Sequence, residues 1–184
     1  MATPTGILMR TVMAQLLIIG FAITVATSSA MAASKSVAFL GVHLQNDNEM
    51  YEPTTNAERT RMANTEKAFI KALDDSGSYK VLPTPHEVRA RIEAGQSIGD
   101  CGGCELDFGK EIGGDVVAWI NVQKVSNLIL NMNVFMADTS TGKRIFTHSV
   151  DIRGNTDETW ARSLAYLVKN YLLAPASQAP QPQG

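Results

Sequence analysis

The chain has 184 residues, with 16 lysines and arginines against 18 aspartates and glutamates, which gives a formal net charge of −2. This balance lacks the basic excess that nucleic acid or an anionic membrane surface requires, so neither is expected as a partner. The length is ordinary for one domain with one hydrophobic core.

Residues 1–32 have the pattern of a secretory signal peptide. Met1–Arg10 holds one cation and no acid, Thr11–Ala26 is a nearly unbroken apolar run, and Ala30-Met31-Ala32 places small residues at the cleavage positions. The run is shorter than the roughly 20 residues of a spanning helix, which favours cleavage over an uncleaved membrane anchor. We expect a periplasmic or secreted protein with no stable membrane anchor, in a compartment where thiols tend to be oxidised.

Residues 33–173 are predicted to form a single α/β domain. The short apolar run at 36–44 predicts a buried strand, and a polar loop follows at 45–55. From Asn56 the apolar residues recur at helical spacing up to Ser76-Gly77, where a helix is expected to end. Residues 79–82 are predicted to form a second strand.

Thr84-Pro85-His86-Glu87 predicts the start of a second helix, with Thr84 as the cap, Pro85 at the first helical position and Glu87 reaching back to the cap. This helix is expected to end near Gly95. A third short helix is predicted at 105–112, closed by two glycines.

From Asp115 the apolar period changes to two, which predicts strands at 116–125, 128–137 and 144–152. Trp119 falls on one face of the first of these strands, and its apolar neighbours fall on the other. Asn155 with Glu158 is predicted to cap a final helix that carries one apolar stripe.

The predicted order is β-α-β-α-α-β-β-β-α, which belongs to the α/β (α+β) class. It implies a mixed sheet of about five strands, parallel in its early part and antiparallel at its end, with helices packed on at least one face. Residues 174–184 consist of Pro, Gln, Ala, Ser and Gly and carry no charged side chain, so they are predicted to be a disordered tail.

Three segments carry a resemblance to a known family: Asp100–Glu105, Gln123–Asn131 and Asp151–Trp160. They resemble a bacterial family of predicted secreted proteins that is carried as a domain of unknown function. The likeness covers nearly all of Val37–Leu173, and it implies no activity. The element order is also similar to the amino-terminal domain of the Tol-Pal β-propeller protein and to envelope lipoproteins of curli secretion and penicillin-binding-protein activation. That likeness is one of fold, and it implies an interaction role rather than catalysis.

Cys101 and Cys104 form the only motif with chemical character. One interpretation is a structural disulfide, a second is a redox-active pair, and a third is a pair of metal ligands. Asp100 and Glu105 flank the pair with carboxylates that repel a thiolate, which favours the structural disulfide.

No other motif indicates a catalytic residue, a cofactor or a metal. His43, His86 and His148 lack ligand spacing, and the acidic loop 45–52 lacks the turn glycine and alternating ligands of a calcium site. The glycines form no phosphate-binding pattern, and no G-x-S-x-G sequence occurs.

The most distinctive surface is a predicted polar face of the sheet, formed by Trp119, Asn121, Gln123, Asn131 and Asn133. Aromatic and amide groups suit adaptable binding, although the same residues could be solvated or covered by the last helix. The resulting hypothesis is a non-enzymatic interaction or accessory module of the cell envelope with a protein partner. A thiol-disulfide redox protein and a periplasmic small-ligand binder are the alternatives, and the oligomeric state stays open.

Overall fold

The computed structural model describes residues 33–175. The predicted signal peptide and the tail beyond Pro175 lie outside the described residues, so the predicted cleavage and domain limits stay predictions. Within the described residues, no helix is long and apolar enough to cross a membrane.

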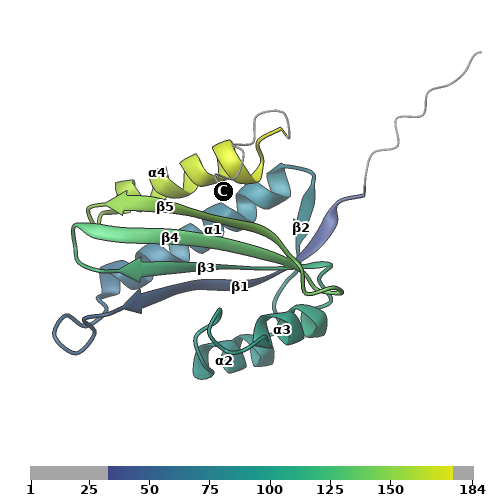
Figure 1. The fold of residues 1–184 in the computed structure, drawn as a ribbon, viewed down its shortest axis with the longest axis horizontal. Coiled ribbons are helices and arrows are strands. Elements are labelled where there is room, and N and C mark those ends of the chain that lie inside the picture. Colours follow the sequence, from purple (N-terminus) through teal and green to yellow (C-terminus); the bar gives the residue numbers. More distant parts are fainter. Residues whose placement is uncertain (1–32, 176–184) are drawn as a thin grey trace, which may run out of the picture. The chain divides into compact units, whose positions relative to one another are not determined.

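Five strands form one mixed sheet in the order β2-β1-β3-β4-β5 (Figure 1). The strands are β1 (Lys35–Asn46), β2 (Tyr79–Val81), β3 (Val116–Lys124), β4 (Ile129–Asp138) and β5 (Arg144–Arg153). β2, β1 and β3 run parallel, whereas β3, β4 and β5 pair antiparallel. The predicted fold class, strand number and change from parallel to antiparallel pairing are confirmed.

Helices lie on both sides of the sheet. They are α1 (Asn56–Asp75), α2 (His86–Ala94), α3 (Cys104–Ile112) and α4 (Asp157–Leu167), and α4 continues into one π-helical segment, η1 (Val168–Leu172). α1 and α4 pack on one face, and α2 and α3 lie on the other beside β1 and β3 (Figure 1).

The two faces of the sheet are buried to different extents. The first face joins all of the antiparallel strands to α1 and α4 through a core that includes Phe69, Met132 and Trp160. The core on the second face is smaller and includes Leu40, Ile92 and Trp119. Since side chains alternate along a strand, β3 is buried on both faces, whereas β5 alternates between exposed and partly buried positions. The second face is therefore left uncovered over β5 and over residues 129–133 of β4, whereas Phe135 and Ala137 further along β4 belong to the smaller core.

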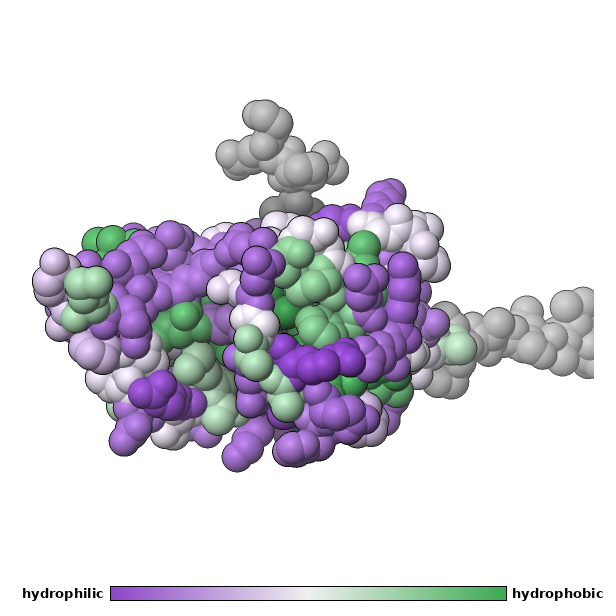
Figure 2. Space-filling view, turned by 90° about the horizontal axis from the view of Figure 1, so that it is seen from below, coloured by the Kyte–Doolittle hydropathy of each residue, from purple (hydrophilic) through white to green (hydrophobic). Residues whose placement is uncertain are grey.

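The view toward the α2 and α3 side shows a mainly hydrophilic surface, with hydrophobic residues in recesses and at one end (Figure 2). That end holds the loop after β1 and the β3–β4 turn. Met50, Leu128 and Ile129 are among the large apolar side chains exposed there. The hydrogen bond from Asn48 Nδ2 to the Val125 carbonyl, at 3.3 Å, joins the two loops.

The predicted start of α2 is wrong in its details. The helix begins after Pro85, with no side-chain cap, and the Thr84 hydroxyl instead donates to the Phe39 carbonyl at 3.3 Å. β2 pairs with β1 only as far as Val37, so the edge of β1 beyond that point has carbonyls that need donors. The Thr84 hydroxyl supplies one of these donors. A tertiary hydrogen bond to Phe39 therefore replaces the helix cap that the local sequence pattern predicted.

The predicted cap of α4 is also wrong by one residue. Thr156 caps the helix together with Thr159, and Asn155 turns inward. Asn155 Nδ2 donates to Glu58 Oε1 at 2.7 Å, and Asn155 Oδ1 accepts from Trp160 Nε1 at 3.0 Å. Asn155 therefore joins α4 to the beginning of α1 instead of ending a helix.

A buried ion pair forms the centre of that junction. Lys124 Nζ lies 2.9 Å from Glu58 Oε1, and the side chains are 3% and 1% exposed. Burial by itself raises the pKa of Glu58, but hydrogen bonds from Thr55, Lys124 and Asn155 outweigh that effect and lower the pKa to about 2. The pair fixes the end of β3 against the amino-terminal turn of α1.

Candidate binding surface

The antiparallel pairing brings the predicted polar residues together on the second face of the sheet. Asn121 pairs with Asn133, and Gln123 pairs with Asn131. The next strand continues both rows, since Asn133 pairs with Ser149 and Asn131 pairs with Asp151. We call Gln123, Asn131, Asn133, Ser149 and Asp151 the amide face. Ser149 and Asp151 were not among the residues predicted from the sequence, although alternation along β5 places them on this side.

Hydrogen bonds between neighbouring strands hold the side chains of the amide face. The Ser149 hydroxyl donates to Asn131 Oδ1 at 2.6 Å, and Asn131 Nδ2 lies 3.5 Å from Asp151 Oδ1. Asn133 Nδ2 donates to the Asn121 carbonyl at 3.3 Å. The side chains of Asn131, Asn133 and Ser149 are thus held in place while they keep hydrogen-bonding capacity for a partner, which lowers the entropy cost of binding.

Trp119 and Asn121 lie beneath the surface, where they are 2% and 7% exposed. The Arg144 guanidinium carbon lies 4.6 Å from the Trp119 ring centroid and 4.9 Å from that of Phe135. The cation–π contacts place Arg144 above both rings, so the arginine is the group that a partner would meet at this end. α4 packs on the opposite face and does not cover these residues.

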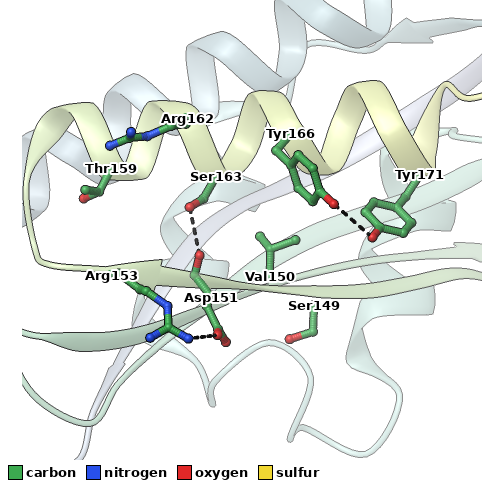
Figure 3. A pocket seen from close by; sticks show the side chains of 9 residues that line it. All are labelled: Ser149, Val150, Asp151, Arg153, Thr159, Arg162, Ser163, Tyr166 and Tyr171. Atoms are coloured by element: carbon green, nitrogen blue, oxygen red, sulfur yellow. Dashed lines mark hydrogen bonds and ion pairs between the residues drawn. The ribbon is translucent and has the colours of Figure 1, made fainter.

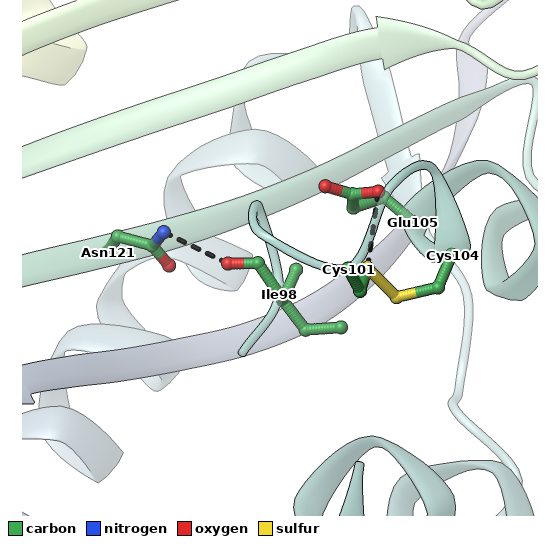
Figure 4. Close-up of a disulfide and its surroundings, with 5 residues drawn as sticks. All are labelled: Ile98, Cys101, Cys104, Glu105 and Asn121. Carbon is green, nitrogen blue, oxygen red and sulfur yellow. Dashed lines mark hydrogen bonds between the residues drawn. A yellow bond between two sulfur atoms is a disulfide. The ribbon is translucent and has the colours of Figure 1, made fainter. Parts of the chain in front are cut away.

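The loop after α2 is what covers Asn121. Asn121 Nδ2 donates to the Ile98 carbonyl at 3.0 Å, and Ile98 is itself buried (Figure 4). Trp119 Nε1 and Asn121 Oδ1 are buried with no hydrogen-bond partner. An unsatisfied buried polar atom costs about 1–3 kcal/mol, so the loop closes over this end of the surface at an energetic penalty.

Cys101 and Cys104 form a disulfide at the end of this loop (Figure 4). Gly102 and Gly103 have φ values of +69° and +110°, which lets the chain turn tightly between the two cysteines. Glu105 Oε2 lies 3.4 Å from Cys101 Sγ, and Glu105 is 7% exposed. A carboxylate at this distance disfavours a thiolate, as the sequence indicated.

The three potential ligand atoms of Cys101, Cys104 and Glu105 lie within 4.8 Å of one another. The disulfide occupies both sulfurs, so this oxidised form offers no thiolate for a metal. None of the histidines joins a metal-ligand cluster within residues 33–175.

Two of the histidines have local roles. His43 Nε2 lies 3.1 Å from the Leu40 carbonyl, and burial lowers the pKa of His43 despite that contact and the nearby Glu66. His148 stacks on Tyr171 with ring centroids 3.5 Å apart, and burial lowers its pKa as well. His86 begins α2.

A hollow of about 710 Å³ lies where the amide face meets α4 (Figure 3). β5 contributes Ser149, Asp151 and Arg153 to its lining, and α4 contributes Arg162 and Tyr166. The amide face thus continues around the outer edge of the sheet.

The sequence matches the family DUF3280, described as "Protein of unknown function (DUF2380)", over residues 35–172. The chain belongs to the DUF3280 family. This result confirms the resemblance to a family of unknown function that the sequence motifs indicated. A search of curated proteins finds no match to this DUF3280 member.

Solved structures that are similar to this DUF3280 chain have low sequence identity to it. The LpoB C-terminal domain from Salmonella enterica is 13% identical with a TM-score of 0.47, and the match covers 68% of this chain and 87% of that one. Lipoprotein GNA1162 from Neisseria meningitidis is 18% identical with a TM-score of 0.46, covering 67% and 83%. TolB from Acinetobacter baumannii is 10% identical with a TM-score of 0.38, covering 74% and 28%.

Proposed function

We propose that this DUF3280 protein is a non-enzymatic interaction module of the bacterial cell envelope, and that it binds a protein partner through the amide face. The observation that carries the proposal is the uncovered second face over β5 and residues 129–133 of β4, where polar side chains lie in two cross-strand rows. The first face of the same strands is packed against α1 and α4. The exposed face is thus available to a partner while the core stays closed.

The chemistry of the amide face favours a protein partner. Amide groups both donate and accept hydrogen bonds, so they can pair with main-chain and polar side-chain groups. Ile129 on the same side of β4 is 62% exposed, and Arg144 lies at the other end of the face. Apolar and arginine contacts at the ends of a polar centre suit protein recognition.

An envelope location is supported by two features. Residues 1–32 carry the signal-peptide pattern, and the cysteines are joined in a disulfide, which persists in oxidising compartments. We therefore place the partner in the periplasm or at the envelope surface.

Site-specific photo-crosslinking in intact cells tests the proposal. A photoreactive amino acid at Gln123 or Ser149 should link to one envelope protein, whereas the same group at exposed Lys67 on α1 should not. With that protein purified, Asn131→Ala together with Asn133→Ala should weaken binding by about tenfold or more, through loss of two hydrogen-bonding side chains. Lys67→Ala is the matched control. Equal crosslinking from Lys67, or unchanged binding by the double variant with an unchanged circular dichroism spectrum, contradicts the proposal.

A further inference from the structure

β5 is a long edge strand. It spans ten residues and pairs with β4 on one side only, whereas the strand at the opposite edge of the sheet, β2, has three residues. A long unpaired edge presents main-chain donors and acceptors to any extended segment.

The pairing pattern shows which main-chain groups of β5 point outward. The Ile129 carbonyl accepts from the N–H groups of Val125 and Ser126, so odd-numbered residues in this part of β4 direct their main chain toward β3. Asn131 is one of them, so the opposite residue, Asp151, directs its main chain away from β4. The Ser163 hydroxyl of α4 reaches the Asp151 carbonyl at 2.9 Å, which places that carbonyl on the outer edge.

The same alternation extends along the strand. Thr147 and Ser149 share the parity of Asp151, so their N–H and C=O groups also point outward. Positions two residues apart along a strand repeat at about 6.8 Å, which is the repeat of an added strand. Among these three residues, the carbonyl of Asp151 accepts a hydrogen bond from a side chain of α4, that of Ser163.

The hollow beside this edge has a second wall. Tyr166 on α4 is 52% exposed, and its hydroxyl lies 3.4 Å from that of Tyr171 (Figure 3). The Arg162 guanidinium lies 3.5 Å from the Glu158 carboxylate, and both side chains are largely exposed. An exposed pair of this kind contributes little, so Arg162 can exchange Glu158 for a carboxylate of a partner.

We propose that the edge of β5 and the α4 wall together form a groove for an extended polypeptide segment, which adds to the sheet as a sixth strand. This inference rests on the proposed function and specifies what the partner presents. Alternate side chains of the added strand would face the amide face and the α4 wall in turn. The segment is therefore expected to carry polar residues on one side, and on the other an apolar or aromatic residue for Tyr166 and an acidic residue for Arg162.

Charge and main-chain complementarity identify this occupant. The hollow is lined by two arginines, Arg153 and Arg162, and by one acid, Asp151. Arg153 lies 3.3 Å from Asp151 in another exposed pair. Each arginine is paired with an exposed neighbouring carboxylate, Asp151 or Glu158, and can exchange it for an acidic residue of the partner. The row of outward main-chain groups favours an extended backbone over a helix or a small anion.

The test uses peptides selected from a phage-displayed library of random dodecapeptides on the purified protein. Selected peptides are synthesised, and binding is measured by fluorescence anisotropy for the native chain, Ser149→Pro and Ser149→Ala. Proline removes the outward N–H at an edge position that tolerates it, whereas alanine keeps the N–H and removes the hydroxyl. We expect Ser149→Pro to weaken binding about tenfold, as for the loss of one main-chain hydrogen bond, and Ser149→Ala to weaken it much less.

Hydrogen exchange on the native chain gives a readout that does not depend on the folding of a variant. Saturating peptide should slow exchange at the Ser149 and Asp151 amides by at least tenfold. Failure to select any peptide that protects these amides overturns the inference. The native chain could instead be a dimer in which both amides are protected without peptide and which Ser149→Pro disperses. That result would overturn the inference, because a second copy of the chain would then occupy the β5 edge.

Two outcomes distinguish binding at the β5 edge from binding at the amide face. If the envelope partner from crosslinking binds Ser149→Pro normally but loses affinity for Asn131→Ala, the amide face is sustained and edge pairing is overturned. If selected peptides depend on the Ser149 N–H while the crosslinks reach no envelope protein, the groove is sustained and the proposed function fails.

Discussion

Removal of Lys124 should destabilise the fold far more than removal of a surface lysine. Lys124→Met leaves the Glu58 carboxylate, 1% exposed, without its cation. Breaking one side of a buried pair costs about 3–5 kcal/mol. Lys124 is one of the groups whose hydrogen bonds lower the pKa of Glu58, together with Thr55 and Asn155, so its removal raises that pKa. The cost of an unpaired buried carboxylate predicts a loss of about 3 kcal/mol or more at pH 7.

The pH dependence of this loss has a definite sign. The pKa of Glu58 is lower in the folded protein, so its contribution is present above pH 4.5 and disappears as the pH falls toward 2. The destabilisation by Lys124→Met should therefore be largest at pH 7 and shrink at pH 3, where the carboxyl group takes up a proton in the variant. The Glu58→Gln variant should lose less stability than the native chain as the pH falls below 4.5, because it lacks the Glu58 carboxylate.

Urea unfolding followed by circular dichroism at pH 7 and pH 3 measures these effects. Lys71→Met is the matched control, because Lys71 and Asp75 form an exposed pair one helical turn apart, worth at most about 0.5 kcal/mol. Combining Lys124→Met with Glu58→Gln should recover part of the stability lost by the single variant, since no buried charge remains unpaired. Equal losses for Lys124→Met and Lys71→Met, or a Lys124→Met loss that is the same at both pH values, would refute the reasoning.

Three further predictions concern processing, the disulfide and close packing. Mass spectrometry of the envelope fraction should find a chain that starts near Ala33, whereas an intact chain in the membrane would indicate an anchor. The native protein should show no free thiol before reduction, and Cys101→Ser with Cys104→Ser should unfold in urea with a loss of about 2 kcal/mol; disulfide exchange activity would favour the redox alternative. Gly114→Ala should lose about 1–3 kcal/mol in the same assay, because a Cβ there would lie 2.6 Å from the Ala38 backbone nitrogen; stability equal to the native chain would show that the backbone relaxes.

Alternation along strands is what made the sheet predictable. The period of two from Asp115 onward reports directly which side chains share a face, and the structure places Asn121, Asn131 and Asn133 on one side. The change from parallel to antiparallel pairing followed from the order of helices and strands along the chain. The sheet order β2-β1-β3-β4-β5 was not predicted. Cap positions were less predictable, because Thr84 and Asn155 each have a tertiary partner, Phe39 and Glu58, that is distant in sequence.

The remaining features of the site depend on which parts of the sheet the helices leave uncovered. Trp119 has the sequence pattern of an exposed aromatic residue, yet Arg144 and the loop after α2 bury it. Arg144 reaches the same side as Trp119 because the β4–β5 register shifts between Met136 and Ala137. A β-bulge of this kind has no clear signal in a single sequence, and neither has the choice of β5 as an edge strand.

The loop over Trp119 and Asn121 gives a last prediction. Gly99 has φ +102°, and a Cβ at this position would lie 2.9 Å from Asn121 Nδ2 and 3.2 Å from Trp119 Nε1. Gly99→Ala should therefore displace the loop and speed hydrogen exchange of the Trp119 indole N–H by at least tenfold, while that of Trp160, which donates to Asn155, stays slow.

Gly102→Ala is the matched control for backbone strain in the same loop. Gly102 also has a positive φ, +69°, but a Cβ there meets nothing within 4 Å. Each alanine costs about 1–2 kcal/mol through its left-handed backbone, and only Gly99→Ala adds a clash with the two side chains beneath. If both variants change the Trp119 exchange rate equally, loop strain alone accounts for the effect. If only Gly99→Ala does so, contact with the glycine is what keeps the unpaired Trp119 N–H from water, and this loop controls access to the Arg144 end of the binding surface.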